Sequence, residues 1–267
     1  MVTVALLELY DRQLRTHAEV AECDEVTRIG PLFLATFPER QRGFITYDSL
    51  DGIHARDLDA LIESAIAHFA ADPRVTHVEW KTRGHDRPED LLDRLVRHGL
   101  TVQATETVMI GEAAPLAASG PELPSGYRLN RAATEAAVRE ADALAGRVFG
   151  EEERASAARG DELVRRWHDH PESFEIWAVC NASGRVVCSG RVEFPENCDV
   201  AGLWGGACEA AERGQGLYRA LTAARARSAI ARGRLYLHSD CTEDSQPILG
   251  RLGLEQVTTT TPALWKR

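Results

Sequence analysis

A short basic and glycine-rich segment has the residue types that most directly suggest a ligand. Residues 212–221 read ERGQGLYRAL, so that Gly214 and Gly216 follow Arg213. Two glycines so close together let the backbone turn tightly and bring its N–H groups near an anion. A helix that follows such a turn directs the positive end of its dipole to the same place. The segment therefore predicts a phosphate-binding turn.

Two common phosphate-binding motifs do not fit this segment. A P-loop needs Lys-Ser or Lys-Thr after its last glycine, whereas Leu217 and Tyr218 follow here. A dinucleotide-binding fingerprint needs a third glycine three residues after the second, and that position is Arg219. The pattern that remains is Arg/Gln-x-x-Gly-x-Gly/Ala.

That pattern resembles the coenzyme A pyrophosphate loop of the Gcn5-related N-acetyltransferases. Arg213 fills its first position and Gly216 its fourth, while Tyr218 stands at the sixth, where Gly or Ala is usual. The resemblance implies that acetyl-CoA is held by this loop. The residues it assigns to coenzyme A here are Arg213, Gly214, Gln215, Gly216, Leu217 and Tyr218. Ser245, at the start of a later predicted helix, is a further candidate for the coenzyme, with capping of that helix as the alternative.

The elements expected around the loop follow the same family's order. Hydrophobic spacing and turn signals predict helices over residues 134–149, 161–168, 217–231 and 246–252, and strands over 174–180, 186–194, 200–208, 235–239 and 255–265. The resemblance implies an α/β fold with a mixed, mostly antiparallel central sheet flanked by helices. It extends over most of residues 126–267.

The first half of the chain repeats part of this pattern. Helices are expected over residues 57–71 and 88–98, and strands over 75–81 and 100–111. The turn before the first of these helices, residues 48–56, has two acids and no Gly-x-Gly, which disfavours a pyrophosphate. We interpret residues 1–118 as a degenerate acetyltransferase-like domain without a coenzyme A loop. An unrelated α/β domain stays open as the alternative.

The second domain is expected to comprise residues 126–267, and residues 119–125 the linker. This linker lies in a Pro-, Gly- and Ser-rich stretch over 113–126. Of the net charge of −10, residues 1–125 carry −9 and residues 126–267 carry −1. An acidic surface disfavours nucleic acid. It either attracts a cationic amine or only keeps a helical surface solvated.

Composition predicts a cytoplasmic protein with reduced thiols. The chain has no run of about 18 apolar residues, its first residues lack the basic start of a signal peptide, and its six cysteines include no Cys-x-x-Cys pair. We therefore expect neither a membrane partner nor a metal ion. The oligomeric state is open, with a homodimer as one option.

The strand before the loop is expected to contact the acyl group. Gly205 and Gly206 weaken a regular strand and favour a bulge or a close ligand approach, although a simple bend explains them as well. In the family a bulged strand at this place supplies backbone groups to the pantetheine arm and the thioester carbonyl. The resemblance therefore assigns Gly206, Ala207 and Cys208 to the coenzyme.

Acyl transfer to an amine also needs a proton acceptor. For an amine with a pKa near 10.4, removing the proton at pH 7 costs about 4 to 5 kcal/mol of free energy. Glu193 and Asp240, each near the end of a predicted strand, are the two candidate bases. The family often has a tyrosine as general acid in the helix over 246–252, but alignment places Leu249 there. The thiolate then leaves unaided, or Tyr218 replaces that tyrosine.

The sequence thus predicts an acetyl-CoA-dependent N-acetyltransferase. The acceptor is expected to be a primary amine of a small molecule that attacks the thioester directly in a ternary complex. A protein that binds acyl-CoA as a sensor without turnover is the alternative, because neither the base nor the acid is fixed by the sequence.

Overall fold

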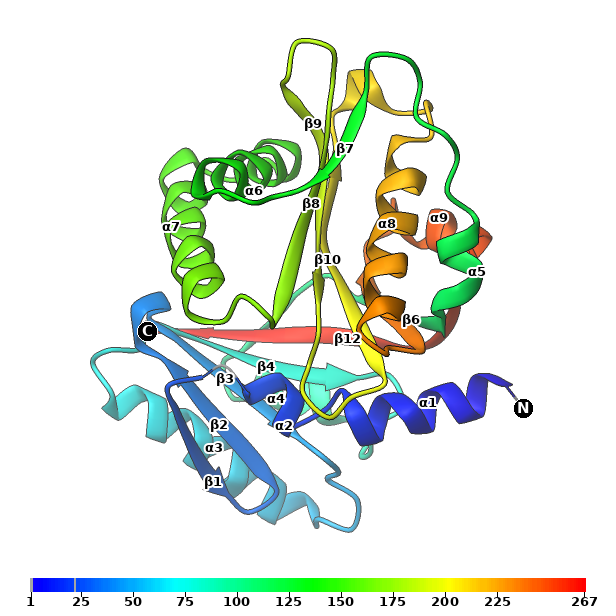
Figure 1. The fold of residues 1–267 in the computed structure, drawn as a ribbon. Helices are drawn as coiled ribbons and strands as arrows, with labels where there is room; N and C mark the ends of the chain where they lie inside the picture. The colour runs from blue at the N-terminus through cyan, green and yellow to red at the C-terminus, as the bar shows by residue number, and fades with distance from the viewer. Residues whose placement is uncertain (1, 22) are drawn as a thin grey trace. The chain divides into compact units, whose positions relative to one another are not determined.

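A computed structural model describes residues 2–21 and 23–267 and divides the chain into two compact units (Figure 1). The first unit contains residues 1–109, 240–246 and 256–267, and the second contains residues 110–239 and 247–255. None of the helices in the described ranges is long and apolar enough to cross a membrane.

The first unit is built on strands in the order β1-β2-β3-β4-β12. β1 to β3 are antiparallel, β3 and β4 are parallel, and β12 is antiparallel to β4. The strands are β1 (Glu25–Ile29), β2 (Leu32–Phe37), β3 (Arg42–Tyr47), β4 (His77–Arg83), β5 (Thr101–Val102), which pairs with β12, and β12 (Glu255–Lys266); the helices are α1 (Val2–Gln13), α2 (His17–Val20), α3 (Ala55–Ala71) and α4 (Leu91–Arg97).

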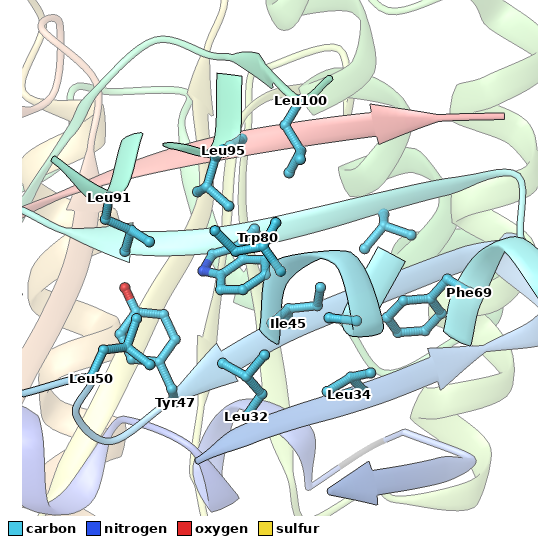
Figure 2. Packing of buried hydrophobic residues seen from close by; sticks show 14 of the residues in the cluster. Leu32, Leu34, Ile45, Tyr47, Leu50, Phe69, Trp80, Leu91, Leu95 and Leu100 are labelled. Carbon is cyan, nitrogen blue, oxygen red and sulfur yellow. The ribbon is translucent and has the colours of Figure 1, made fainter. Parts of the chain in front are cut away.

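Helices α3 and α4 pack on one face of this sheet. Figure 2 shows part of this core, with Leu95 of α4 above Trp80 of β4 and Phe69 of α3 to the right of Ile45 of β3. These four side chains are fully buried. Burial of one such large apolar side chain contributes about 1.5 to 3 kcal/mol. Ala263 of β12 belongs to the same core.

The second unit has strands in the order β11-β10-β9-β8-β7. β7 to β10 are antiparallel, and β10 and β11 are parallel. The elements are β7 (Arg128–Arg131), β8 (Phe174–Cys180), β9 (Val186–Glu193), β10 (Val200–Cys208), β11 (Tyr236–Cys241), α5 (Ala113–Ala118), α6 (Glu135–Phe149), α7 (Glu153–Asp169), α8 (Leu217–Ala231) and α9 (Gln246–Arg251). Residues of β11 and α9 at one end of each element are grouped with the first unit, as is the first half of β6 (Glu106–Glu112).

Helices cover both faces of the second unit's sheet. α6 and α7 pack on one face, where Leu144 and Val164 contact Phe174 and Ile176 of β8. α8 packs on the other, where Leu221 lies in a cluster with residues of β8, β9 and β10 (Figure 1). This placement holds the start of α8 beside the end of β10.

The last strand of the chain groups with the first unit, whereas the sequence assigned it to the second domain. β12 pairs with β4 from Thr260↔Arg83 to Lys266↔His77. A pairing between strands so far apart in the chain leaves no signal in the local pattern. The predicted domain boundaries themselves stay a prediction.

The structure has most of the expected elements, with small shifts at the ends of several and four larger differences. α7 begins at Glu153 rather than at 161; the strand expected over 100–111 is divided into β5 and β6; α5 forms in the Pro-, Gly- and Ser-rich stretch just before the predicted linker 119–125; and β1, β2, β3, β7, α1 and α2 were not expected. β2 is buried at all six positions, so it lacks the alternation that identifies a half-exposed strand.

Candidate functional site

β10 is bulged where the sequence has its glycine pair. Its pairing with β9 is interrupted between Trp204 and Ala207, and Gly205 has a φ of +57°. The expectation of a bulge is confirmed. A bulge turns backbone groups out of the ladder and makes them available to a ligand.

β10 also separates from its parallel neighbour at this point. In the described part of the chain, β10 and β11 pair only from Val200↔Tyr236 to Gly202↔His238. Past this point the Ser239 hydroxyl donates to the Leu203 carbonyl at 3.1 Å. The edge of β10 beyond Leu203 therefore carries N–H and C=O groups that this ladder does not use.

The loop that follows has the backbone of an anion site. Gly214 and Gly216 have φ values of +80° and +82°, a conformation that L side chains rarely adopt. Gly216 is the N-cap of α8 and provides no side-chain acceptor for the first N–H groups of the helix. Those N–H groups and the helix dipole favour an anion at this position.

The charges around the loop are arranged by hydrogen bonds. Arg213 is exposed, and its Nε donates to the Cys208 carbonyl at 3.3 Å, which ties the guanidinium to the end of β10. The carboxylate of Glu212 accepts from the Tyr127 hydroxyl at 2.5 Å and from Gln215 Nε2 at 3.0 Å. Hydrogen bonding to Glu212 raises the pKa of Tyr127. Arg213 is thus the residue that gives the loop its positive charge.

Tyr218 lies against the bulge. A Cβ atom added at Gly206 would approach the Tyr218 hydroxyl to 2.8 Å, so only glycine leaves room for this ring. The ring also lies 5.9 Å from the buried guanidinium of Arg225. The structure therefore brings the first turn of α8 and the bulged strand together.

We expect Gly206→Ala to displace the Tyr218 ring and destabilise the second unit by about 1 to 3 kcal/mol, the usual cost of overpacking. Denaturant unfolding followed by hydrogen exchange in β10 measures this. Tyr218→Ala in the Gly206→Ala background removes the obstructing ring and should recover part of the loss. No recovery would contradict the contact.

Glu193 of β9 is held by two arginines. Its Oε1 accepts from Arg191 Nε at 2.7 Å and from Arg166 Nη1 at 3.1 Å. Burial acts to raise the pKa of Glu193, but the two guanidinium groups outweigh it and lower the pKa. The side chain is 22% exposed, and both ion pairs use the same oxygen. Glu193 pairs with Gly202, which places it roughly 10 Å along the sheet from the bulge.

Asp240 belongs to the first unit, where it is engaged by a lysine. Its Oδ2 accepts from Lys81 Nζ at 2.9 Å, and its side chain is 4% exposed. Burial acts to lower the pKa of Lys81, but the neighbouring charges, of which Asp240 contributes most, raise it. Both candidate bases are therefore engaged by cations, which makes each a weaker proton acceptor. Of the two, Glu193 lies in the same unit as the bulge and the loop.

The other predicted site residues fall into two groups. Gly206, Ala207, Cys208 and residues 213–218 lie in the second unit, while Ser245 lies in the first. The Ser245 hydroxyl donates to the Thr242 carbonyl at 3.3 Å in the turn before α9. Leu249 is 1% exposed and packs as an apolar residue.

Two residues near the bulge were not singled out by the sequence. His238 of β11 stacks edge-on against Trp204 at 5.4 Å, at the point where β10 and β11 separate. Arg225 of α8 is 1% exposed and donates to the Arg191 carbonyl and the Thr222 hydroxyl. Two sequence signals could have identified them: a histidine within a predicted strand and an arginine on the apolar face of a predicted helix.

Comparison with known proteins identifies the fold. No protein-family model matches the chain, and no curated protein matches it. A Gcn5-related N-acetyltransferase from Kribbella flavida is similar, with a TM-score of 0.70 and 18% identity over 98% of this chain and 93% of that chain.

Two further solved structures agree. A tandem GNAT protein from the clavulanic acid biosynthesis pathway has a TM-score of 0.61 and 16% identity, covering 90% of this chain and 81% of its own. A GCN5-related N-acetyltransferase from Sphaerobacter thermophilus has a TM-score of 0.62 and 13% identity, covering 88% and 76%. The chain therefore has the acyl-CoA N-acyltransferase fold, and the expected fold class is confirmed.

Proposed function

We propose that the chain is an N-acetyltransferase that binds acetyl-CoA at the 213–218 loop and transfers its acetyl group to a primary amine of a small molecule. One observation carries the proposal: a loop with two left-handed glycines caps α8 directly after a bulged β10 that separates from β11. The names of the similar solved structures support the same activity.

In the proposed complex the loop holds the pyrophosphate and β10 holds the acyl arm. Arg213 and the N–H groups of residues 214–218 would neutralise the two phosphates. The exposed backbone edge at Gly206, Ala207 and Cys208 would hydrogen bond to the pantetheine arm and the thioester carbonyl. Such fixed donors stabilise the oxyanion that forms when the amine attacks.

The amine must lose a proton, and Glu193 is the proposed acceptor. Its Oε1 is fixed by two arginines, while Oε2 has no part in those ion pairs. Its separation from the bulge is too large for direct transfer, so the proton would reach Oε2 through a bound water. Tyr218, whose hydroxyl lies against Gly206, is the proposed proton donor to the departing thiolate.

We expect Glu193→Gln to lower kcat about 100-fold, in the usual range for a general base, with little change in acetyl-CoA affinity. Because the pKa of Glu193 is lowered, its carboxylate stays ionised from pH 6 to 9. The rise of kcat/KM over this range should therefore reflect deprotonation of the substrate amine. Glu196→Gln, an exposed neighbour, is the matched control. An unchanged kcat would exclude Glu193 as the base.

The activity itself is tested by thiol release from acetyl-CoA across a panel of primary amines, with product masses to identify the acetylated amine. The proposal predicts amine-dependent release in equal amount with the acetylated product. Tight acetyl-CoA binding without turnover on any amine would instead favour the acyl-CoA sensor.

A further inference from the structure

A groove on the second unit lies outside the site described above. It runs between the C-terminal half of α8 and strands β7 and β8, and its volume of ≈ 670 Å³ is in the range of small-molecule sites. The residues that carry the argument are Leu129, Arg131, Glu175, Trp177, Arg227 and Arg232. At 1.5 Å per residue along α8, the far end of the groove is roughly 20 Å from the 213–218 loop.

Glu175 organises one side of this groove. Its side chain is 6% exposed, and its Oε1 accepts from Arg131 Nη1 at 3.0 Å and from Arg232 Nη2 at 3.1 Å. Its Oε2 accepts from Trp177 Nε1 at 3.0 Å and from the Ser228 hydroxyl at 2.5 Å. Burial acts to raise the pKa of Glu175, but these hydrogen bonds lower it. The buried carboxylate is therefore ionised and fully occupied by donors of the groove.

The arginines keep further donors for a ligand. The Arg131 side chain is 57% exposed, and among the described residues its hydrogen-bonding partner is Glu175 alone. Arg227 is exposed and donates to the Ala117 carbonyl at 2.9 Å. Each guanidinium has five N–H groups. Three arginines against one glutamate leave a surplus of two positive charges, on a chain whose net charge is −10.

The groove also has an apolar part. Leu129, Ala224 and the half-buried Trp177 ring contribute to its lining. The hydrogen bond from Trp177 Nε1 to Glu175 fixes the orientation of the indole. A fixed aromatic face beside guanidinium groups suits a ligand that combines a flat ring with an anionic group.

We propose that this groove binds a small organic dianion that carries a flat apolar ring, of the chemical class of an aryl phosphate. The doubly charged phosphate would replace water on Arg131 and Arg227, and the ring would contact Trp177 and Leu129. The surplus of two charges matches the dianion, and the limited volume favours a small molecule over an extended acidic peptide. This site is independent of the proposed acetyltransferase activity.

The test is a titration of the full chain with phenyl phosphate at pH 8 and low ionic strength, followed by the tryptophan indole N–H resonances. Trp177→Phe identifies the Trp177 resonance, which should shift saturably. The double variant Arg131→Ala/Arg227→Ala should raise Kd at least tenfold, because charge-assisted hydrogen bonds are lost. Arg154→Ala, an exposed arginine of α7, should leave Kd unchanged.

Three outcomes would overturn the proposal. If phenyl phosphate still binds to the double variant, Arg131 and Arg227 do not hold the ligand. If binding is lost in Arg213→Glu, the ligand binds at the 213–218 loop instead. If inorganic phosphate and phenyl phosphate have the same Kd, the apolar part of the groove does not contact the ligand, because contact with the ring should improve affinity at least threefold. Arg227→Glu, which changes only an exposed side chain, keeps the test valid if the double variant fails to fold.

Discussion

The double variant Arg213→Glu/Gly216→Val is expected to bind acetyl-CoA about 1,000-fold more weakly than the natural chain. Charge reversal at Arg213 replaces an attraction to the pyrophosphate by a repulsion, which we expect to cost about 2 kcal/mol. A valine at position 216 would have to adopt a φ of +82°, with a Pro121 side-chain carbon 3.0 Å from its Cβ. Keeping the loop in its binding conformation would then cost about 2 kcal/mol more. Together these costs correspond to about three decades in Kd, measurable by calorimetric titration.

Gly184→Val provides the matched control for this variant. Gly184 has nearly the same φ, +85°, in the turn between β8 and β9, and no atom lies within 4 Å of its added Cβ. It carries the same type of backbone strain away from the loop, so acetyl-CoA affinity should remain as in the natural chain. Equal losses in both variants would mean that the effect is general destabilisation.

The second large effect is expected in the first unit, where Glu19 lies between two cations. Its carboxylate accepts from Arg83 Nη2 at 2.5 Å, pairs with Lys81 at 3.3 Å, and accepts from the Thr46 hydroxyl at 2.5 Å. The Arg83 side chain is fully buried and that of Glu19 is 10% exposed. Glu19→Gln leaves a buried positive charge without its partner, so we expect a loss of about 3 to 5 kcal/mol in the stability of this unit.

The pH dependence of the same group gives a second readout. Burial acts to raise the pKa of Glu19, but Arg83 and Lys81 lower it to about 2 from an ordinary value of 4.5. Between these two values the unfolded chain binds more protons, so the stabilisation is present above pH 4.5 and is lost as the pH falls towards 2. The shift corresponds to about 3 kcal/mol.

Glu19→Gln should therefore flatten the acid limb of the first unit's stability, measured by hydrogen exchange of the β4 amides. Glu89→Gln is the control, because that side chain is 80% exposed and pairs only with Arg87 in the described residues. An acid limb in Glu19→Gln as steep as in the control would refute this role of Glu19.

The sequence predicted the second unit well because its signals are local. α8 has the predicted bounds, since Gly216 marks its start and alanine-rich periodicity its length. β8 and β10 also have the predicted bounds, because continuous apolar runs end at turn residues. The bulge in β10 was predicted from a local signal as well, the adjacent glycines Gly205 and Gly206.

What the sequence missed depends on contacts between distant residues. The pairing of β12 with β4 joins residue pairs such as Trp265 and Val78, which no local pattern relates. Asp240 looked available as a strand-end acid, but its partner Lys81 lies 159 positions earlier. The environments of Glu193 and Glu175 likewise depend on arginines from other elements. Side-chain roles of this kind follow only from the tertiary structure.

We propose that one loop, at the start of α8, is the acyl-CoA site of this chain. In the first unit, the turn between β3 and α3 has no glycine pair and contains Asp48 and Asp51. Calorimetric titration of the natural chain with acetyl-CoA tests this most directly. We predict saturable binding of one molecule per chain. Absence of binding, or two molecules per chain, would contradict the account.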